Sequence, residues 1–205
     1  MTHGDDSGLV LPPSVAPIQV VVIPVQQHKE GVIDKANEIA DILKAAGYRV
    51  KVDASEQSPG WKFSEYEMKG VPLRVEIGPR DIADNKCVIV RRDNREKSFV
   101  SLDNLCESVA EGLKNLQQAI FEKALKNRED RTFTAENLDE LKKIASENNG
   151  YIRAMWCGDL ECEMKLKEEA DVTSRCMPFG MDPIGDKCVC CGREAKKLVY
   201  WGKAY

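Results

Sequence analysis

The sequence contains no apolar run that approaches the roughly 20 residues needed to cross a membrane, and no secretory signal pattern opens it. It also lacks internal repeats and low-complexity tracts. We therefore expect no membrane partner and a cytoplasmic location.

An excess of positive charge is missing as well. The formal net charge is −4, whereas proteins that bind nucleic acid through a general electrostatic field are usually basic. A function with RNA would therefore require a local site, because the overall charge does not favour it.

Histidine is scarce, with only His3 and His28, while the chain has eight cysteines. Eight cysteines without a secretory signal indicate metal ligation before disulfides. A catalytic zinc usually recruits a histidine or a carboxylate and keeps one position open for water. Both histidines are far in sequence from the cysteine-rich end, so a structural metal is favoured over a catalytic one.

The remaining composition is that of a globular protein, and 205 residues suffice for one large domain or two small ones. A β-branched strand at 18–25, an amphipathic helix at 30–46 and a strand at 48–52 predict a right-handed βαβ unit. A strand at 86–92 is expected to pair with 97–102 through a turn. The predicted fold class is α/β, with a mixed, mostly parallel sheet flanked by helices.

A domain boundary is expected near Arg131, where the charged run at 127–133 interrupts the hydrophobic pattern. One long helix is predicted before it, at 101–127. Beyond it we expect a small α/β domain with a helix at 135–147 and strands at 151–156 and 173–179.

The cysteines of this second part fall into two pairs. Cys157 and Cys162 enclose four residues, whereas Cys188 and Cys191 enclose two and are followed by glycine. Two such pairs make a tetrahedral thiolate site, and the second pair has the spacing of a zinc knuckle. Cys190 competes with its neighbour Cys191, but adjacent residues cannot easily both point at one ion.

Other interpretations of the cysteines remain open. Cys176, in the middle of a predicted strand, is a fifth candidate ligand that we expect to be packed. The cysteines could also be unrelated free thiols. In a redox or metal-handling protein, Cys190 would be the candidate for a reactive thiol of low pKa.

The stretch from Gly60 to Asp81 reads GWKFSEYEMKGVPLRVEIGPRD. It contains an aromatic pair, a helical run at 64–69, a Gly-Val-Pro stop and an alternating strand at 73–77. Taken alone, this pattern is typical of a solvated helix and a half-buried strand with charges outside. Its carboxylates and guanidinium groups could also accept from a base amine or bind a base edge or phosphate.

The ordered series G-W-K-F…G-x-P-x-R-x-E-x-G-P-R resembles the anticodon-binding domain of prolyl-tRNA synthetases of the archaeal and eukaryotic type. The resemblance implies that Glu67, Arg74 and Arg80 read the two guanines shared by proline anticodons. Arg80 stands where many relatives have lysine. Trp61 or Phe63 would offer a stacking face to an unstacked base, with core packing as the alternative for either.

The resemblance extends along the whole chain. HGDDSGLVLPPSVAPIQV is similar to the link that leaves the family's catalytic domain. It implies a linker at 1–17, an anticodon-binding domain at 18–130 and a C-terminal zinc domain at 131–205. The family's C-x4-C…C-x2-C zinc site, which some members have lost, matches the two cysteine pairs. The K-A-Y ending is similar to the family's terminus, where the last tyrosine (Tyr205 here) lies toward the catalytic domain.

For the whole enzyme the resemblance implies a homodimeric class II ligase that uses ATP and magnesium to activate proline and then esterifies tRNA. The class II catalytic motifs are absent from this sequence, so the fragment alone is expected to be inactive and monomeric, with structural zinc as cofactor and the anticodon loop of proline tRNA as partner. The alternative is a freestanding RNA-binding or regulatory module that uses the anticodon-binding fold.

Overall fold

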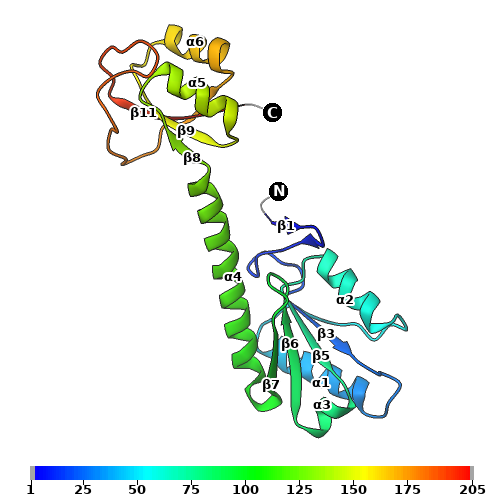
Figure 1. Cartoon of the computed structure of the whole chain (residues 1–205). Coiled ribbons are helices and arrows are strands. Elements are labelled where there is room, and N and C mark those ends of the chain that lie inside the picture. Colours follow the sequence, from blue (N-terminus) through cyan, green and yellow to red (C-terminus); the bar gives the residue numbers. More distant parts are fainter. Residues whose placement is uncertain (1–2, 204–205) are drawn as a thin grey trace. The chain divides into compact units, whose positions relative to one another are not determined.

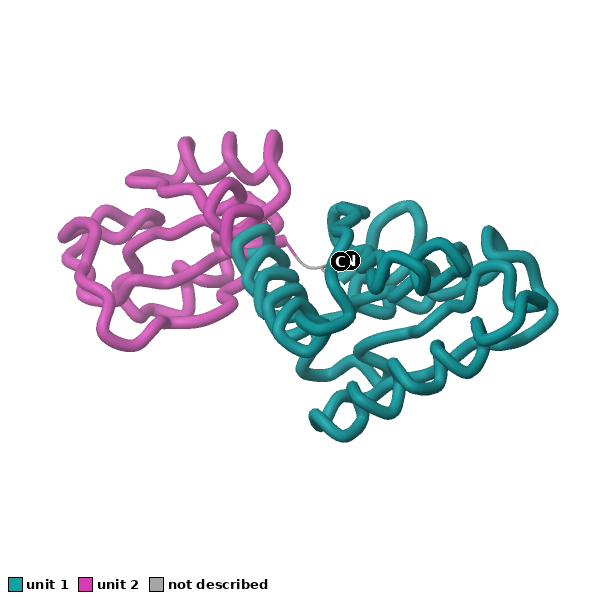
Figure 2. Tube along the Cα trace, turned by 90° about the horizontal axis from the view of Figure 1, so that it is seen from below, with its two compact units in different colours: residues 1–124 teal, residues 125–205 magenta. Residues whose placement is uncertain are grey.

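A computed structural model of the chain describes residues 3–203. It divides into two compact units, residues 1–124 and residues 125–205, drawn in different colours in Figure 2. The division falls within the long helix α4 (Leu105–Asp130). The boundary expected near Arg131 lies at the end of this helix. Tyr205 lies outside the described residues. No helix in the described part of the chain is long and apolar enough to span a membrane.

Unit 1 is built on a five-stranded mixed sheet (Figure 1). The first three strands in space are parallel to one another, and the other two pairings are antiparallel, so the expectation of a mostly parallel sheet holds for only half of the pairings. In spatial order the strands are β4 (Val50–Val52), β3 (Val20–Pro24), β5 (Leu73–Ile77), β6 (Lys86–Arg91) and β7 (Lys97–Ser101).

Helices cover both faces of this sheet. The helix α1 (Val32–Ala45) and the first half of α4 bury their apolar stripes on one face, where Leu73, Val75 and Ile77 point. On the opposite face, α2 (Pro59–Met68) packs Tyr66 against alternate residues of β3. Two short helices complete the unit, α3 (Pro79–Ala83) and the 3-10 turn η1 (Leu102–Asn104).

The helix α2 begins earlier than the sequence pattern predicts. The expected helical run started at residue 64, whereas the structure has helix from Pro59. The Ser58 hydroxyl accepts a hydrogen bond from the Trp61 backbone N–H (3.3 Å), and Pro59 occupies the first helical position, where its missing N–H costs nothing. The Ser-Pro-Gly sequence, which suggested a turn, is therefore a helix start.

Residues 3–17, expected to form a linker, are part of unit 1 and make specific contacts with the rest of it. The short strands β1 (Gly4–Asp5) and β2 (Gly8–Leu9) form an antiparallel hairpin. After it, the Arg49 side chain donates to the backbone carbonyls of Ala16 (2.8 Å) and Pro13 (2.9 Å). The N-terminal segment is thus held by specific hydrogen bonds.

Unit 2 has a four-stranded sheet covered on one face by two helices (Figure 1). Trp201, which is fully buried, lies in the core between sheet and helices. The strand expected at 173–179 ends at Cys176, and the exposed residues Met177 and Phe179 follow it. The strand order is β10 (Thr173–Cys176), β11 (Lys197–Gly202), β9 (Tyr151–Trp156) and β8 (Thr132–Thr134), and the helices are α5 (Leu138–Glu147) and α6 (Leu160–Ala170).

Substitution of two apolar residues of unit 1 should lower the free energy of unfolding by very different amounts. Leu73 is fully buried in the central strand and faces α4, where a Cβ on Gly112 would lie 3.3 Å from its Cδ1. Leu73→Ala should therefore lower the free energy of unfolding by about 2–5 kcal/mol. Phe99, on the edge strand, is 74% exposed, and Phe99→Ala should cost less than about 1 kcal/mol. Urea denaturation followed by circular dichroism measures both; equal costs would contradict this assignment of the core.

Candidate functional site

The first candidate site is centred on Arg74, a buried guanidinium on the central strand β5. Because side chains alternate along a strand, Leu73 and Val75 enter the core while Arg74 and Glu76 point to the face that carries α2. The side chain of Arg74 donates from Nη1 to Glu67 Oε1 (3.1 Å) and from Nε to Glu76 Oε1 (2.9 Å). Two carboxylates therefore hold one guanidinium on this face of the sheet.

An aromatic ring completes the arrangement. The Arg74 guanidinium lies over the ring of Phe63, with its carbon 4.0 Å from the ring centroid. Phe63 and Glu67 are four residues apart on α2, so they share one face of that helix. Stacking on Phe63 and two charge-assisted hydrogen bonds leave the guanidinium little freedom to rotate.

This cluster retains hydrogen-bonding capacity for a ligand. The hydrogen bonds of Arg74 with the described residues use Nε and Nη1, and the side chains of Arg74 and Glu67 are 10% and 25% exposed. The second carboxylate oxygen of Glu67 lies 3.9 Å from the Arg95 guanidinium, a distance too long for a hydrogen bond. A carboxylate beside a guanidinium can accept from one edge of a base while the guanidinium donates to another atom.

The structure brings only part of the predicted set together. Glu67, Arg74 and Phe63 are in contact, whereas Trp61 lies elsewhere on α2 and is 48% exposed. Arg80 lies in α3, beyond the end of β5, and is exposed. Neither Trp61 nor Arg80 makes a hydrogen bond or ion pair with Glu67 or Arg74 among the described contacts. Their roles remain predictions.

Two residues of the surroundings had no assigned role in the sequence analysis. Glu76 could have been found, because it follows Arg74 by two and therefore shares its face of the strand. Arg92 is only 4% exposed and donates from Nε to the backbone carbonyl of Glu67 (2.8 Å). Nothing local in the sequence distinguishes Arg92 from its neighbour Arg91.

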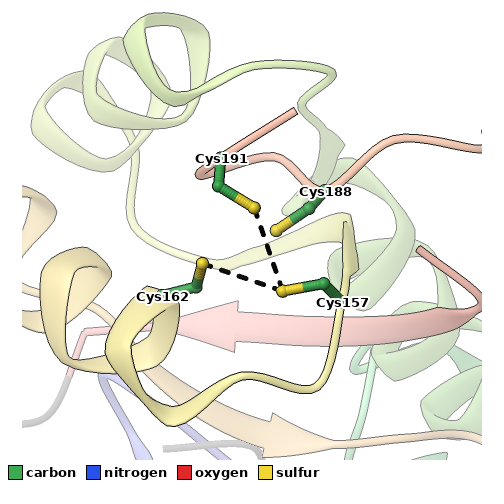
Figure 3. Close-up of side chains that lie close together, drawn as sticks. All are labelled: Cys157, Cys162, Cys188 and Cys191. Atoms are coloured by element: carbon green, nitrogen blue, oxygen red, sulfur yellow. Dashed lines mark hydrogen bonds between the residues drawn. The ribbon is translucent and has the colours of Figure 1, made fainter. Parts of the chain in front are cut away.

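The second candidate site is a cluster of four cysteines in unit 2 (Figure 3). The Sγ atoms of Cys157, Cys162, Cys188 and Cys191 all lie within 4.8 Å of one another. Cys157 Sγ is 3.7 Å from Cys162 Sγ and 3.9 Å from Cys191 Sγ. In a tetrahedral site with metal–sulfur bonds of about 2.3 Å, the sulfurs are separated by roughly 3.8 Å. The cluster therefore has the dimensions of a tetrahedral metal site.

Local turns bring the two cysteine pairs into position. Cys157 follows β9, and Cys162 lies in the first turn of α6, whose start is capped by the Asp159 carboxylate accepting from Glu161 N–H (3.1 Å). The other pair lies in a tight turn closed by a hydrogen bond from Gly192 N–H to the Cys188 carbonyl (2.9 Å). Gly192 has a φ of 69°, which favours glycine.

A single arginine joins both halves of the cluster. Arg193 donates from Nη2 to Asp159 Oδ2 (2.7 Å) and from Nε to Cys191 Sγ (3.2 Å). The hydrogen bond from Arg193 lowers the pKa of Cys191 to about 6, so this thiol favours the thiolate form that binds metals. Burial raises the pKa of Cys157 and Cys162, whose ionisation therefore needs a cation.

Two further cysteines of unit 2, Cys190 and Cys176, do not belong to the four-sulfur cluster, although Cys190 packs beside Cys162 and Cys188. Cys190 packs against the apolar core of unit 2, and burial raises its pKa. It therefore does not have the low pKa of a reactive redox thiol. Cys176 is exposed at the end of β10. The structure thus gathers the four cysteines chosen from spacing.

Comparisons with known proteins match both parts of the chain that contain these clusters. A family described as "Anticodon binding domain" matches residues 19–112, which include Glu67 and Arg74. A family described as "Prolyl-tRNA synthetase, C-terminal" matches residues 138–205, which include all four cysteines. The chain belongs to the prolyl-tRNA synthetase family. Similar curated proteins are "Proline--tRNA ligase" of Lachnospira eligens (60% identical) and of Clostridium novyi (59%), and a "Proline--tRNA ligase 2" of Bacillus cereus (55%).

Each of these alignments covers the whole of this chain but only 43% of the relative. The chain therefore spans less than half the length of the synthetases that it matches. It carries the family's anticodon-binding domain and its C-terminal domain.

The cysteine geometry predicts a selective effect of single substitutions on metal content. The purified chain should contain about one divalent metal ion, and Cys191→Ser should lose most of it because a four-thiolate shell would be broken. Cys190→Ser and Cys176→Ser are the matched controls and should keep the ion. Acidification should release it, since the ligands bind as thiolates. Elemental analysis after gel filtration measures the content; loss in Cys190→Ser with retention in Cys191→Ser would mean that the wrong thiol was assigned.

Proposed function

We propose that this chain reads the anticodon of proline tRNA as part of a proline–tRNA ligase. The observation that carries the proposal is the contact of Glu67 and Arg74 within the anticodon-binding domain. The names of the relatives support it for the whole protein. An RNA partner needs a local site in a chain of net charge −4, and this cluster would provide one.

The geometry suggests how a guanine would be recognised. The Watson–Crick edge of an unpaired guanine presents N1–H and the N2 amino group, two donors that suit a carboxylate such as Glu67. Arg74 holds this carboxylate in place, and its remaining N–H groups would donate to the acceptors O6 and N7 or to a phosphate. Glu76 fixes Arg74 from the other side. Specificity would thus come from a hydrogen-bonded set whose members position one another.

Arg80 and Trp61 complete the proposed RNA surface at its edges. Arg80 is exposed in α3, where its planar guanidinium could bind a second guanine or a phosphate. Trp61 has nearly half of its surface exposed and could stack on a base. Both roles rest on the family resemblance.

We further propose zinc as the metal of the four-cysteine cluster, in a structural role. Four thiolates fill a tetrahedral shell, which leaves no position for a reacting water. Zinc would supply the positive charge that lets the buried thiols of Cys157 and Cys162 ionise, and it would join β9, α6 and the turn at 188–192. Loss of zinc should therefore destabilise unit 2 and leave chemistry unaffected.

For the whole protein we propose the activity implied by the names of its relatives, the ATP- and magnesium-dependent attachment of proline to tRNA, in a cytoplasmic homodimer. We assign no catalytic step to the residues of this chain. Their contribution would be to select the tRNA, so substitutions here should act on tRNA binding and not on activation of proline.

If Glu67 contacts the anticodon, substitution of two nearby glutamates of α2 should affect RNA affinity differently. Glu67→Gln should weaken binding of a proline anticodon stem-loop by about 10- to 100-fold, since one bidentate base contact contributes roughly 1–3 kcal/mol. Glu65→Gln removes the same charge from the same helix, where Glu65 pairs with Lys69, and should leave affinity unchanged or slightly higher. Fluorescence anisotropy with labelled RNA measures both.

Two further measurements decide this proposal. A stem-loop with both anticodon guanines changed to adenine should bind the wild-type chain weakly, and Glu67→Gln should reduce the difference between the two RNAs. In the full-length enzyme, Arg74→Ala should raise KM for tRNA and leave proline activation unchanged. Equal affinity of the wild-type chain for both loops, together with unaltered tRNA kinetics for Arg74→Ala, would refute anticodon reading by these residues.

A further inference from the structure

The N-terminal hairpin, residues 4–9, lies directly against the end of α2 that carries Glu67. Two glycines mark this close approach: a Cβ on Gly8 would come within 2.5 Å of the Met68 Cα, and a Cβ on Gly70 within 2.7 Å of the Leu9 Cβ. The Leu11 N–H donates to the Gly70 carbonyl (3.3 Å). The hairpin and the C-terminal turn of α2 are therefore in backbone contact.

A buried arginine connects the hairpin to the backbone of Glu67. Arg92 donates from Nη1 and Nη2 to the two carboxylate oxygens of Asp5 (2.8 and 2.7 Å), and from Nε to the Glu67 carbonyl (2.8 Å). The Asp5 carboxylate satisfies both ends of a guanidinium fork whose side chain is only 2% exposed. The hydrogen bonds from Arg92 hold the pKa of Asp5 well below its usual range, so the pair is ionised in the folded protein.

A second arginine makes a parallel connection to the side chain of Glu67. Arg95, in the turn between β6 and β7, donates to the Ser7 hydroxyl, and its guanidinium lies 3.9 Å from Glu67 Oε2. Both the backbone and the carboxylate of Glu67 are thus adjacent to arginines that the hairpin orients. The Glu67 carbonyl also accepts from the Gly70 N–H (3.0 Å), so Arg92 is its second donor, and a cation at this place stabilises the C-terminal end of α2.

We propose that the hairpin is a positioning element of the anticodon site, with Asp5 acting through Arg92 to fix Glu67 for base recognition. The inference rests on the proposed function, because Glu67 must be a reader for its position to matter. Asp5, Arg92 and Arg95 are positioning residues that need not touch RNA. Residues 3–9 then belong to the recognition module, although they lie outside the part of the chain matched as an anticodon-binding domain.

Asp5 and its neighbour Asp6 offer a matched pair for the test. Asp6 is exposed and has no hydrogen bond or ion pair among the contacts of residues 3–203. Asp5→Asn and Asp6→Asn each remove one negative charge from the same hairpin, which by charge alone should strengthen RNA binding. If Asp5 positions Glu67, Asp5→Asn should instead weaken binding of the proline anticodon stem-loop. We expect about a tenfold loss of affinity, the effect expected when a charged hydrogen-bond network is broken. Asp6→Asn should bind as well as wild type or better.

A second variant changes no charge. Gly8 has a φ of 125° and no room for a Cβ against Met68, so Gly8→Ala should displace the hairpin from α2. Gly180→Ala is its control: Gly180 also has a positive φ, of 66°, but lies in unit 2 with nothing within 4 Å of an added Cβ. Gly8→Ala should weaken stem-loop binding, and Gly180→Ala should not.

Binding to two different anticodon stem-loops distinguishes a positioning role of the hairpin from a merely structural one. Each variant is measured, well below its melting temperature, with the proline loop and with the loop in which both guanines are adenine. Selective loss of affinity for the proline loop in Asp5→Asn and Gly8→Ala supports positioning. A merely structural hairpin would lower the melting temperature and leave both affinities unchanged, and this would overturn the inference while the proposed function stands. A wild-type chain that binds both loops equally would overturn the proposed function and this inference with it.

Discussion

The guanidinium of Arg74 sets a constraint that unit 1 must satisfy. It sits in the middle strand of a sheet at 8% exposure, and a buried charge is tolerated only when it is paired and hydrogen-bonded. Glu76 provides one partner from the same strand, but the other has to come from a different element, and α2 provides it as Glu67. The hydrogen bond from Arg74 to Glu67 therefore ties α2 to this face of the sheet, in addition to the packing of Tyr66 there. The proposed site for base recognition would use the same contacts that make the buried charge acceptable.

Unit 2 meets a different constraint, because its core is small and the long segment before its last strand has little regular structure. Between β10 and β11 about twenty residues run without helix or strand, and they are held chiefly by the turn containing Cys188 and Cys191. Arg193 links this turn to the cap of α6 through Asp159. A metal bound by four thiolates would cross-link the same segments, so the proposed zinc substitutes for hydrophobic area that a domain of this size cannot bury.

Local patterns predicted most of the helices and strands, whereas three features were missed for different physical reasons. Alternation and helical spacing located the strands and the main helices, and cysteine spacing selected four sulfurs that the structure gathers within 4.8 Å. The antiparallel half of the first sheet was underestimated, since a β-branched run fits either direction of pairing. Periodicity also could not show that α2 starts at Pro59, because a capping serine and a proline resemble a turn. The link between Asp5 and Arg92 joins residues 87 positions apart, and no pattern within a sequence window contains it.

The charge balance of the site bears on what kind of recognition it can support. In the proposed recognition cluster, the three arginines Arg74, Arg92 and Arg95 face the three carboxylates of Asp5, Glu67 and Glu76, so the described cluster is close to neutral. A neutral cluster attracts the phosphate backbone weakly. Discrimination between bases would therefore have to come from hydrogen bonds of side chains that are already held in position before RNA binds. Affinity gained from phosphates would then arise elsewhere, at exposed groups such as Arg80 or in the part of the synthetase that this chain does not span. On this proposal, the negative net charge of −4 is compatible with binding to RNA. The anticodon-binding domain would contribute selectivity between anticodons, and other groups would contribute most of the binding strength.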